Sequence, residues 1–249
     1  MAQRNSGPVY TALGLSGVAM ADAWAMQLNP AGMADIRKPV FVIAYEQHFL
    51  DQGLSTQSAF LVIPFSENVF GLSFEQYGFS TYKEQVSGFA YSRRFGNSIS
   101  LAIGVRYHEV SIPTYGSSHT FSVEAGLQYA LNEKFSIASH LYNPSGRRYR
   151  DQQGPVIPVR LSLGICYRFS TKVLGVADIR KSAGLSIDAG SGMEYALIEK
   201  FILRGGVSLY PFRQYAGFGL HYEKIRVDAA ISSHTSLGYS PQISLGYEF

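Results

Sequence analysis

The sequence has little cysteine, little charge and no long hydrophobic run. Its single cysteine, Cys166, excludes an internal disulfide and a cysteine-based zinc site. Charged residues make up 16% of the chain, where about 25% is usual. No stretch approaches the roughly 18 uninterrupted apolar residues that cross a membrane as a helix. The net charge is +3 without a long basic run, so nucleic acid is not an expected partner.

Aromatic residues and glycine are abundant, and they occur in a two-residue alternation. The chain has 17 Tyr, 16 Phe and 25 Gly. In the final segment, PQISLGYEF, apolar residues alternate with polar or small ones up to Phe249. The same alternation runs through 99–107, 121–131 and 159–169. Successive side chains of a strand point to opposite faces, and most strands of soluble proteins have only about five or six residues. Long strands with two different faces are therefore predicted.

Turn residues divide the chain into about fourteen predicted strands, and tight turns follow every second strand. Short turns that alternate with longer loops are typical of bacterial outer-membrane barrels. The predicted fold is all-β: a transmembrane antiparallel β-barrel of about 14 strands at 39–249, preceded by a segment at 1–38. An even strand number predicts that both termini are periplasmic. The strands are expected near 39–49, 56–65, 68–78, 82–95, 97–111, 118–131, 133–142, 157–169, 172–181, 184–197, 200–210, 213–222, 225–234 and 240–249.

The two faces of these strands predict a lipid-facing outside and a polar lumen. One face is aliphatic or aromatic, with aromatic residues near the strand ends, as in a lipid-facing band. The other carries Ser, Gly, Gln and most mid-strand charges, which are costly at the lipid midplane but can pair or hydrate inside. The alternative is a soluble sandwich with its apolar face inward, but the long strands and scarce charge favour the barrel. The predicted lumen charges are Arg106, Glu124, Arg160, Arg168, Asp188, Glu194, Arg204 and Asp228.

No catalytic or metal site is recognisable. The six histidines lie on separate strands or loops without metal-ligand spacing, and Ser118 beside His119 is no substitute for a spatial relay. We therefore predict no enzyme activity, metal or cofactor. The lumen charges mix opposite signs, so a paired network that anchors the N-terminal segment is favoured over a hydrated, weakly selective passage. Glycines at 190–192 and 205–206 are expected to relieve crowding against that segment.

Residues 12–36, ALGLSGVAMADAWAMQLNPAGMADI, are small and apolar and contain a turn at Asn29, Pro30, Ala31 and Gly32. They could form an amphipathic N-terminal helix, or they could pack inside a lumen, which small residues would allow. The stretch GLSGVAMADAWAMQLNPAGMA resembles the N-terminal region of FadL-like outer-membrane barrels, including the PorV and PorQ branch associated with type IX secretion. This resemblance implies a fourteen-stranded barrel with the segment inside as a hatch. Tyr247 and Phe249 resemble the C-terminal signal read by the barrel-assembly machinery.

Two functions follow from the resemblance. The first is a non-enzymatic accessory or scaffold subunit of an outer-membrane complex for secretion or surface attachment, with other outer-membrane proteins as partners. The alternative is a FadL-like passive transporter of small hydrophobic molecules. The largest loop, 142–156, is polar and basic without a hydrophobic cluster, which counts against an external capture groove and favours the first function. Outer-membrane lipids are expected partners in both cases. The opening MAQRNSG has no charged segment followed by an apolar core, so no signal peptide is predicted in the sequence as given.

Deleting Phe249 is expected to lower the yield of assembled barrel in the outer membrane far more than it changes any activity of the barrels that do assemble. The physical reason is that a terminal aromatic residue acts in recognition during assembly. The measurement is the amount of folded barrel in membrane fractions, with Phe249→Tyr as the control that keeps an aromatic end. Normal assembly without Phe249 would contradict this role.

Overall fold

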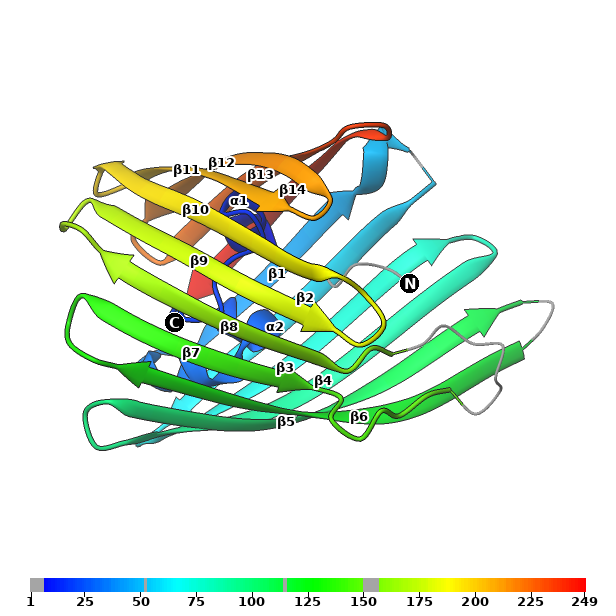
Figure 1. Ribbon diagram of the computed structural model, residues 1–249, viewed down its shortest axis with the longest axis horizontal. Helices are drawn as coiled ribbons and strands as arrows, with labels where there is room; N and C mark the ends of the chain where they lie inside the picture. The colour runs from blue at the N-terminus through cyan, green and yellow to red at the C-terminus, as the bar shows by residue number, and fades with distance from the viewer. Residues whose placement is uncertain (1–6, 52, 114–115, 150–156) are drawn as a thin grey trace.

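The computed structural model describes residues 7–51, 53–113, 116–149 and 157–249. Within these ranges fourteen antiparallel strands follow one another around a closed barrel (Figure 1). The strands are β1 (Val40–Gln47), β2 (Ser55–Phe65), β3 (Asn68–Phe79), β4 (Tyr82–Phe95), β5 (Ile99–Ile112), β6 (Gly116–Ala130), β7 (Phe135–Tyr142), β8 (Arg160–Arg168), β9 (Val173–Ser182), β10 (Ile187–Ile198), β11 (Phe201–Leu209), β12 (Phe212–Tyr222), β13 (Ile225–His234) and β14 (Gly238–Glu248).

Pairing between the first and last strands closes the barrel. β1 and β14 run antiparallel, with Val40 opposite Glu248 and Glu46 opposite Gln242. The Phe249 N–H donates to the Pro39 carbonyl at 3.0 Å. Every other strand pairs with its two neighbours in sequence. A closed sheet satisfies its backbone groups without water, as a membrane-spanning sheet requires. The predicted fold class is confirmed.

The connections at the two ends of the barrel differ. One end of the barrel, on the left in Figure 1, carries a series of short turns, and the C-terminus lies among them. We call it the turn end. These turns are 66–67, 96–98, 131–134, 169–172, 199–200 and 223–224. The opposite loop end carries the 3-10 helix η2 (His48–Leu50) and the longest connection, 143–159. The other loop-end connections, such as 80–81 and 210–211, are as short as the turns, so the longer loops expected from the sequence are limited to 48–54 and 143–159.

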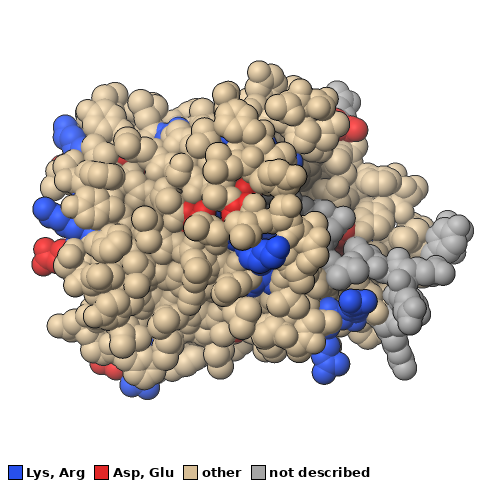
Figure 2. All heavy atoms as spheres, viewed as in Figure 1, with Lys and Arg blue, Asp and Glu red and all other residues tan. Residues whose placement is uncertain are grey.

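Large apolar side chains cover the outside of the barrel. Ile103 is 66% exposed and Leu163 is 51% exposed, although both lie well inside a strand. Figure 2 shows that uncharged residues cover most of one face, with Lys and Arg mainly near its edges. Alternate residues, such as Ser100 and Ser162, are buried and point inward. An apolar outer band of this kind is suited to contact with lipid.

The N-terminal segment lies inside the barrel, and we call residues 7–36 the hatch (Figure 1). Its Tyr10, Leu13 and Met26 are completely buried. None of the helices in the described residues is long and apolar enough to cross a membrane. The hatch helices are α1 (Gly7–Ala12), which packs against β11–β14, α2 (Ala25–Leu28), and the 3-10 helix η1 (Pro30–Asp35), which packs against β3–β6.

Glycines in the wall allow the hatch backbone to approach closely. A Cβ at Gly192 would lie 2.5 Å from the Leu13 Cα, and one at Gly206 would lie 2.9 Å from the Ala12 carbonyl oxygen. A side chain at either position would therefore displace the hatch. Gly190 also faces the hatch, and the predicted role of these glycines is confirmed. Gly205 is the exception: it points outward, away from the hatch.

The longest loop contributes to a hydrophobic cluster that the sequence did not reveal. Tyr149 and Ile157 are buried and pack with Val110 and Tyr142 at the loop ends of β5 and β7. The Asn143 side chain donates to the Ile157 carbonyl at 2.9 Å and so holds the base of the loop. The expectation that this loop lacks a hydrophobic cluster is wrong. Its apolar residues are scattered among basic ones, and only the folded loop brings them together.

Arginine on the outer wall should destabilise the barrel more strongly the closer it lies to the middle of the membrane. We expect Ile103→Arg, well inside β5, to lower the free energy of unfolding by about 2–4 kcal/mol. Ile99→Arg, at the turn end of the same strand, should cost only about 0–1 kcal/mol because the guanidinium reaches water. Denaturant unfolding in lipid vesicles measures both. Equal losses at the two positions would contradict a lipid-facing wall at this depth.

Candidate functional site

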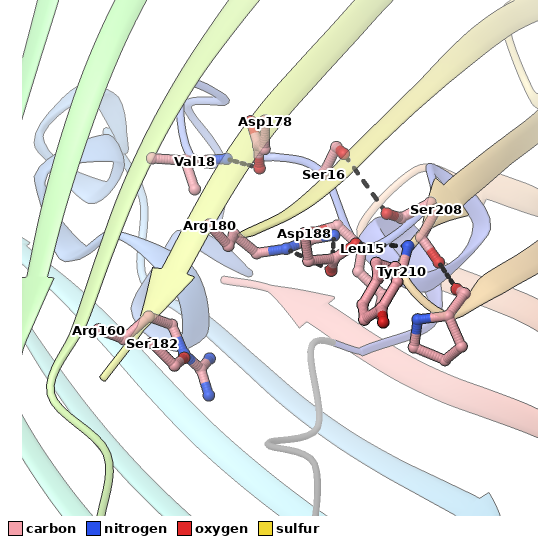
Figure 3. A network of polar contacts seen from close by, with 12 residues as sticks. Leu15, Ser16, Val18, Arg160, Asp178, Arg180, Ser182, Asp188, Ser208 and Tyr210 are labelled. Carbon is pink, nitrogen blue, oxygen red and sulfur yellow. Dashed lines mark hydrogen bonds and ion pairs between the residues drawn. The ribbon is translucent and has the colours of Figure 1, made fainter. Parts of the chain in front are cut away.

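Asp178 of β9 binds the backbone of the hatch. Its Oδ2 accepts hydrogen bonds from the N–H groups of Gly17 at 2.8 Å and Val18 at 3.1 Å. Asp178 points from the strand toward Val18 in Figure 3. The carboxylate is almost completely buried, so its charge is stabilised chiefly by these donors. Strand β9 thereby holds a hatch segment that has no regular secondary structure of its own.

Arg180 lies two residues further along β9 and links the hatch to β10 and to the connection between β11 and β12 (Figure 3). Its Nη1 donates to the Leu15 carbonyl of the hatch. Its Nη2 donates to Oδ2 of Asp188 in β10 at 2.8 Å. The other Asp188 oxygen accepts the Tyr210 N–H, in the connection between β11 and β12, at 3.2 Å. A single arginine therefore satisfies a hatch carbonyl and fixes the carboxylate beside it.

Arg106 makes the corresponding link on the other side of the lumen. Its Nη2 donates to the Met26 carbonyl of the hatch at 2.8 Å, and its Nε donates to Oε1 of Glu124 at 2.8 Å. The second Glu124 oxygen lies 3.0 Å from Nε2 of His140. All three side chains are almost fully buried. Breaking one partner of such a buried group is costly because the remaining charge is left without compensation.

The predicted turn at 29–32 is the third attachment point. Asn29 caps η1, because its Oδ1 accepts the Ala31 N–H at 3.2 Å. Its Nδ2 donates to the Val18 carbonyl of the hatch at 2.9 Å and to the Leu127 carbonyl of β6 at 3.4 Å. Pro30 occupies the first helical position, where no N–H is needed. Asn29 thus joins two parts of the hatch to the wall.

A cavity of about 770 Å³ lies at the turn end between the hatch and the wall. Arg204 lines it and pairs with Oε2 of Glu194 and Oδ1 of Asp228, both at 2.7 Å. Asp22 of the hatch faces the same space and accepts a hydrogen bond from the Tyr10 hydroxyl. Burial raises the pKa of the Asp22 carboxyl to about 6. Arg168, predicted as a lumen charge, is exposed at the rim of this cavity.

The contact between the hatch and β1–β3 is apolar. The ring of Trp24 packs edge-on against Phe60 of β2, with 4.8 Å between the ring centroids. Met26 and Met33 are completely buried in the same cluster as Val62 and Val69. The alternation predicted a polar inner wall, but the inner wall is not uniformly polar. It is aliphatic where β1–β3 meet the hatch.

The eight predicted lumen charges do not form one network. Arg106 with Glu124 and Arg204 with Glu194 and Asp228 make two separate clusters. Asp188 reaches the hatch through Arg180, and Arg160 donates to Ser182 at 3.4 Å. Among the described residues, no group of His, Cys, Asp or Glu has the arrangement of a metal site. The role predicted for these charges, to anchor the hatch, stays a prediction.

The sequence did not predict that Asp178 and Arg180 contact the hatch, although both form hydrogen bonds with its backbone. Both lie on the predicted strand 172–181, where the alternation of polar and apolar residues fails. The reason is now apparent: Leu174 and Val176 share the inward face with these charged residues and pack in the hatch cluster. The residues of β9 that point inward could be recognised only once the position of the hatch was known.

Comparison with known proteins supports the fold. The sequence matches no protein-family model, and no curated protein matches it. The toluene transporter TodX of Pseudomonas putida has a TM-score of 0.75 at 11% identity, covering 96% of each chain. A FadL homologue of Pseudomonas aeruginosa has a TM-score of 0.71 at 14% identity, covering 98% of each chain. The CymD monoaromatic hydrocarbon channel has 0.71 at 13% identity, covering 98% of this chain and 97% of that one. The resemblance to FadL-like barrels holds for the fold, and these structures do not bear on the PorV and PorQ branch.

Removing the Asp178 carboxylate should loosen the hatch. Asp178→Ala leaves two buried N–H groups without an acceptor, at about 1–3 kcal/mol each. Asp178→Asn keeps one acceptor oxygen and should have a smaller effect. The readouts are proteolysis within residues 7–36 and the emission of Trp24, the only tryptophan, which should shift to longer wavelength as water reaches it. Asp51→Ala, in the connection between β1 and β2, is the control, and an unchanged hatch in Asp178→Ala would contradict this role.

Proposed function

We propose that this protein is a passive transporter of small hydrophobic molecules across the outer membrane, with both termini in the periplasm. The fold it shares with a toluene transporter and a monoaromatic hydrocarbon channel supports this function. The orientation rests on the turn end, because bacterial barrels place their short turns in the periplasm. The hatch fills the lumen, so passage requires part of it to move.

The observation that carries the proposal is the apolar contact of the hatch with β1–β3, which continues at β9 through Leu174 and Val176. The hydrogen bonds described above tie the hatch to β5, β6 and β9. Toward β1–β3 it presents Trp24, Met26 and Met33 to aliphatic wall residues. Methionine side chains adapt readily to a changing surface. A shift of the hatch away from β1–β3, with its polar attachments kept, would open a route lined by Val62 and Val69 that favours apolar solutes.

The accessory-subunit function is the one that the sequence alone favoured, with transport as its alternative. It rested on the PorV-like resemblance and on the lack of an external capture groove; among the described residues, the loop cluster around Tyr149 is buried and supplies no such groove. The similar structures named above are transporters and channels. We therefore favour transport, and the two functions differ in one measurable respect, the presence of a stoichiometric protein partner.

Uptake by cells tests the proposal. Cells that lack their own hydrocarbon transporter and express this protein should take up radiolabelled toluene faster than cells with an empty vector, while uptake of a small sugar stays unchanged. Val69→Asn, on the apolar side, should lower toluene uptake several-fold because an unpaired amide is costly in an apolar route. Ser73→Asn, an inward position of the same strand, is the matched control.

Two outcomes would contradict transport. One is toluene uptake equal to that of control cells, with the barrel shown to be folded. The other is an equal increase for the sugar, which would indicate a water-filled pore. A stoichiometric outer-membrane partner in native extracts, together with absent uptake, would favour the accessory function.

A further inference from the structure

Two adjoining hollows mark the outer wall below the turn between β8 and β9. The first, of about 460 Å³, lies over β6–β9. The second, of about 540 Å³, lies over β8–β11. Both are lined by Ile165 and Ala177, so they meet along the β8–β9 pair. Large apolar side chains cover much of the outer wall, and these hollows lie between them.

Small outward residues create the second hollow. Gly175 and Gly205 both pair with Met193 across the sheet, and Ala177 pairs with Ser191. Tyr167 and Phe169 bound the hollow on one side, as a T-shaped pair with 4.8 Å between ring centroids. The wall is therefore indented where a bilayer-facing sheet would otherwise present aliphatic side chains.

Gly205 has no packing reason to be glycine. A Cβ there would meet only the Tyr215 carbonyl oxygen, at 4.0 Å, and its backbone is not in the left-handed region. The inward glycines differ, since Gly192 and Gly206 have the hatch backbone against them. The space outside Gly205 is therefore open to whatever surrounds the barrel.

Two lysines stand above the hollows at the turn end. Lys172 ends the turn between β8 and β9, and Lys200 lies in the turn between β10 and β11. Both are exposed, and the Lys200 ammonium lies 4.7 Å from the centroid of the Tyr222 ring. The Ala196 N–H of β10 donates to the Lys172 carbonyl at 2.8 Å, so Lys172 lies beside the strand whose turn to β11 carries Lys200. Glu199, beside Lys200, is the acidic residue of these two turns.

The spacing matches the depth profile of a lipid leaflet. A strand rises about 3.3 Å per residue, so Gly175 lies about 10 Å along β9 from Lys172, and Gly205 lies about 17 Å along β11 from Lys200. Half of the hydrocarbon core of a bilayer is about 15 Å thick. Because barrel strands tilt by about 35–45°, these separations correspond to about 8 and 13 Å of depth. With the lysines at the level of the phosphate groups, the hollows then lie at the depth of acyl chains.

We propose that this face binds one two-chain phospholipid. Lys172 and Lys200 hold the phosphate, the two hollows take the two acyl chains, and Glu199 complements an ethanolamine ammonium group. Charge complementarity at the rim and the pairing of two apolar hollows favour a lipid over a protein. A membrane protein would also fit small residues closely, but it would not require cations at headgroup depth.

Native mass spectrometry of the full chain, with phosphatidylethanolamine added in mild detergent, tests this site. We expect one lipid retained per wild-type barrel. The double variant Lys172→Gln/Lys200→Gln should bind about thirtyfold more weakly, since each of the two lysines contributes about 1 kcal/mol near a lipid surface and about 1.4 kcal/mol is tenfold in affinity. Ser191→Leu/Gly205→Leu should also lose the lipid, because its side chains fill the second hollow.

The control variants make the same kinds of change in charge and in side-chain size, but at positions outside the proposed site. Ala59→Leu lies on the outer face of β2, and Lys83→Gln lies at the loop end of β4. Both should retain the lipid. Equal retention by all folded variants would overturn the proposal. So would the loss of a co-purifying membrane protein from Gly205→Leu with lipid binding unchanged, because the wall would then be a protein interface. Toluene uptake is not part of this test, so its outcome is independent of the proposed transport.

Discussion

A chain that crosses lipid as strands has to pair its backbone N–H and C=O groups with other strands, because the hydrocarbon offers no partner. This constraint explains why β1 and β14 meet, why the sheet has no free edge at the closure, and why the C-terminal Phe249 hydrogen-bonds beside the start of β1. The closed sheet separates an outside that contacts lipid from an inside that has to be filled. The two-residue alternation of the sequence follows from that separation.

The hatch fills the inside in the way that a core fills a soluble protein. Its apolar residues pack on the aliphatic inner surface of β1–β3, and wall side chains from the remaining strands satisfy its irregular backbone. Backbone that forms no regular structure is tolerated at membrane depth only when it is buried in protein in this way. The lumen therefore combines two kinds of contact, an apolar one that packs side chains together and a polar one that fixes particular atoms.

The barrel could be predicted from the sequence because its signal is repeated in most of the strands. The predicted strands 82–95 and 225–234 coincide with β4 (Tyr82–Phe95) and β13 (Ile225–His234). The contacts of the hatch were harder to predict, since they join residues far apart in sequence, such as Gly17 and Asp178. Alternation also failed to give the direction of Asp178, because its strand turns aliphatic residues inward as well. Tyr149 was missed for a similar reason, as its neighbours in the cluster come from other segments.

The seam between β1 and β14 has a consequence for the order of folding. The hatch directly precedes β1, yet its Leu13 backbone lies against Gly192 of β10. It cannot be threaded into a finished cylinder without reopening the wall, so it has to be in place before the last strand zips against the first. Closure needs the complete chain, because a sheet without β14 exposes both the hatch and an open edge. Contacts of such long sequence separation are slow to form, which makes protection of the unclosed sheet the limiting need during biogenesis.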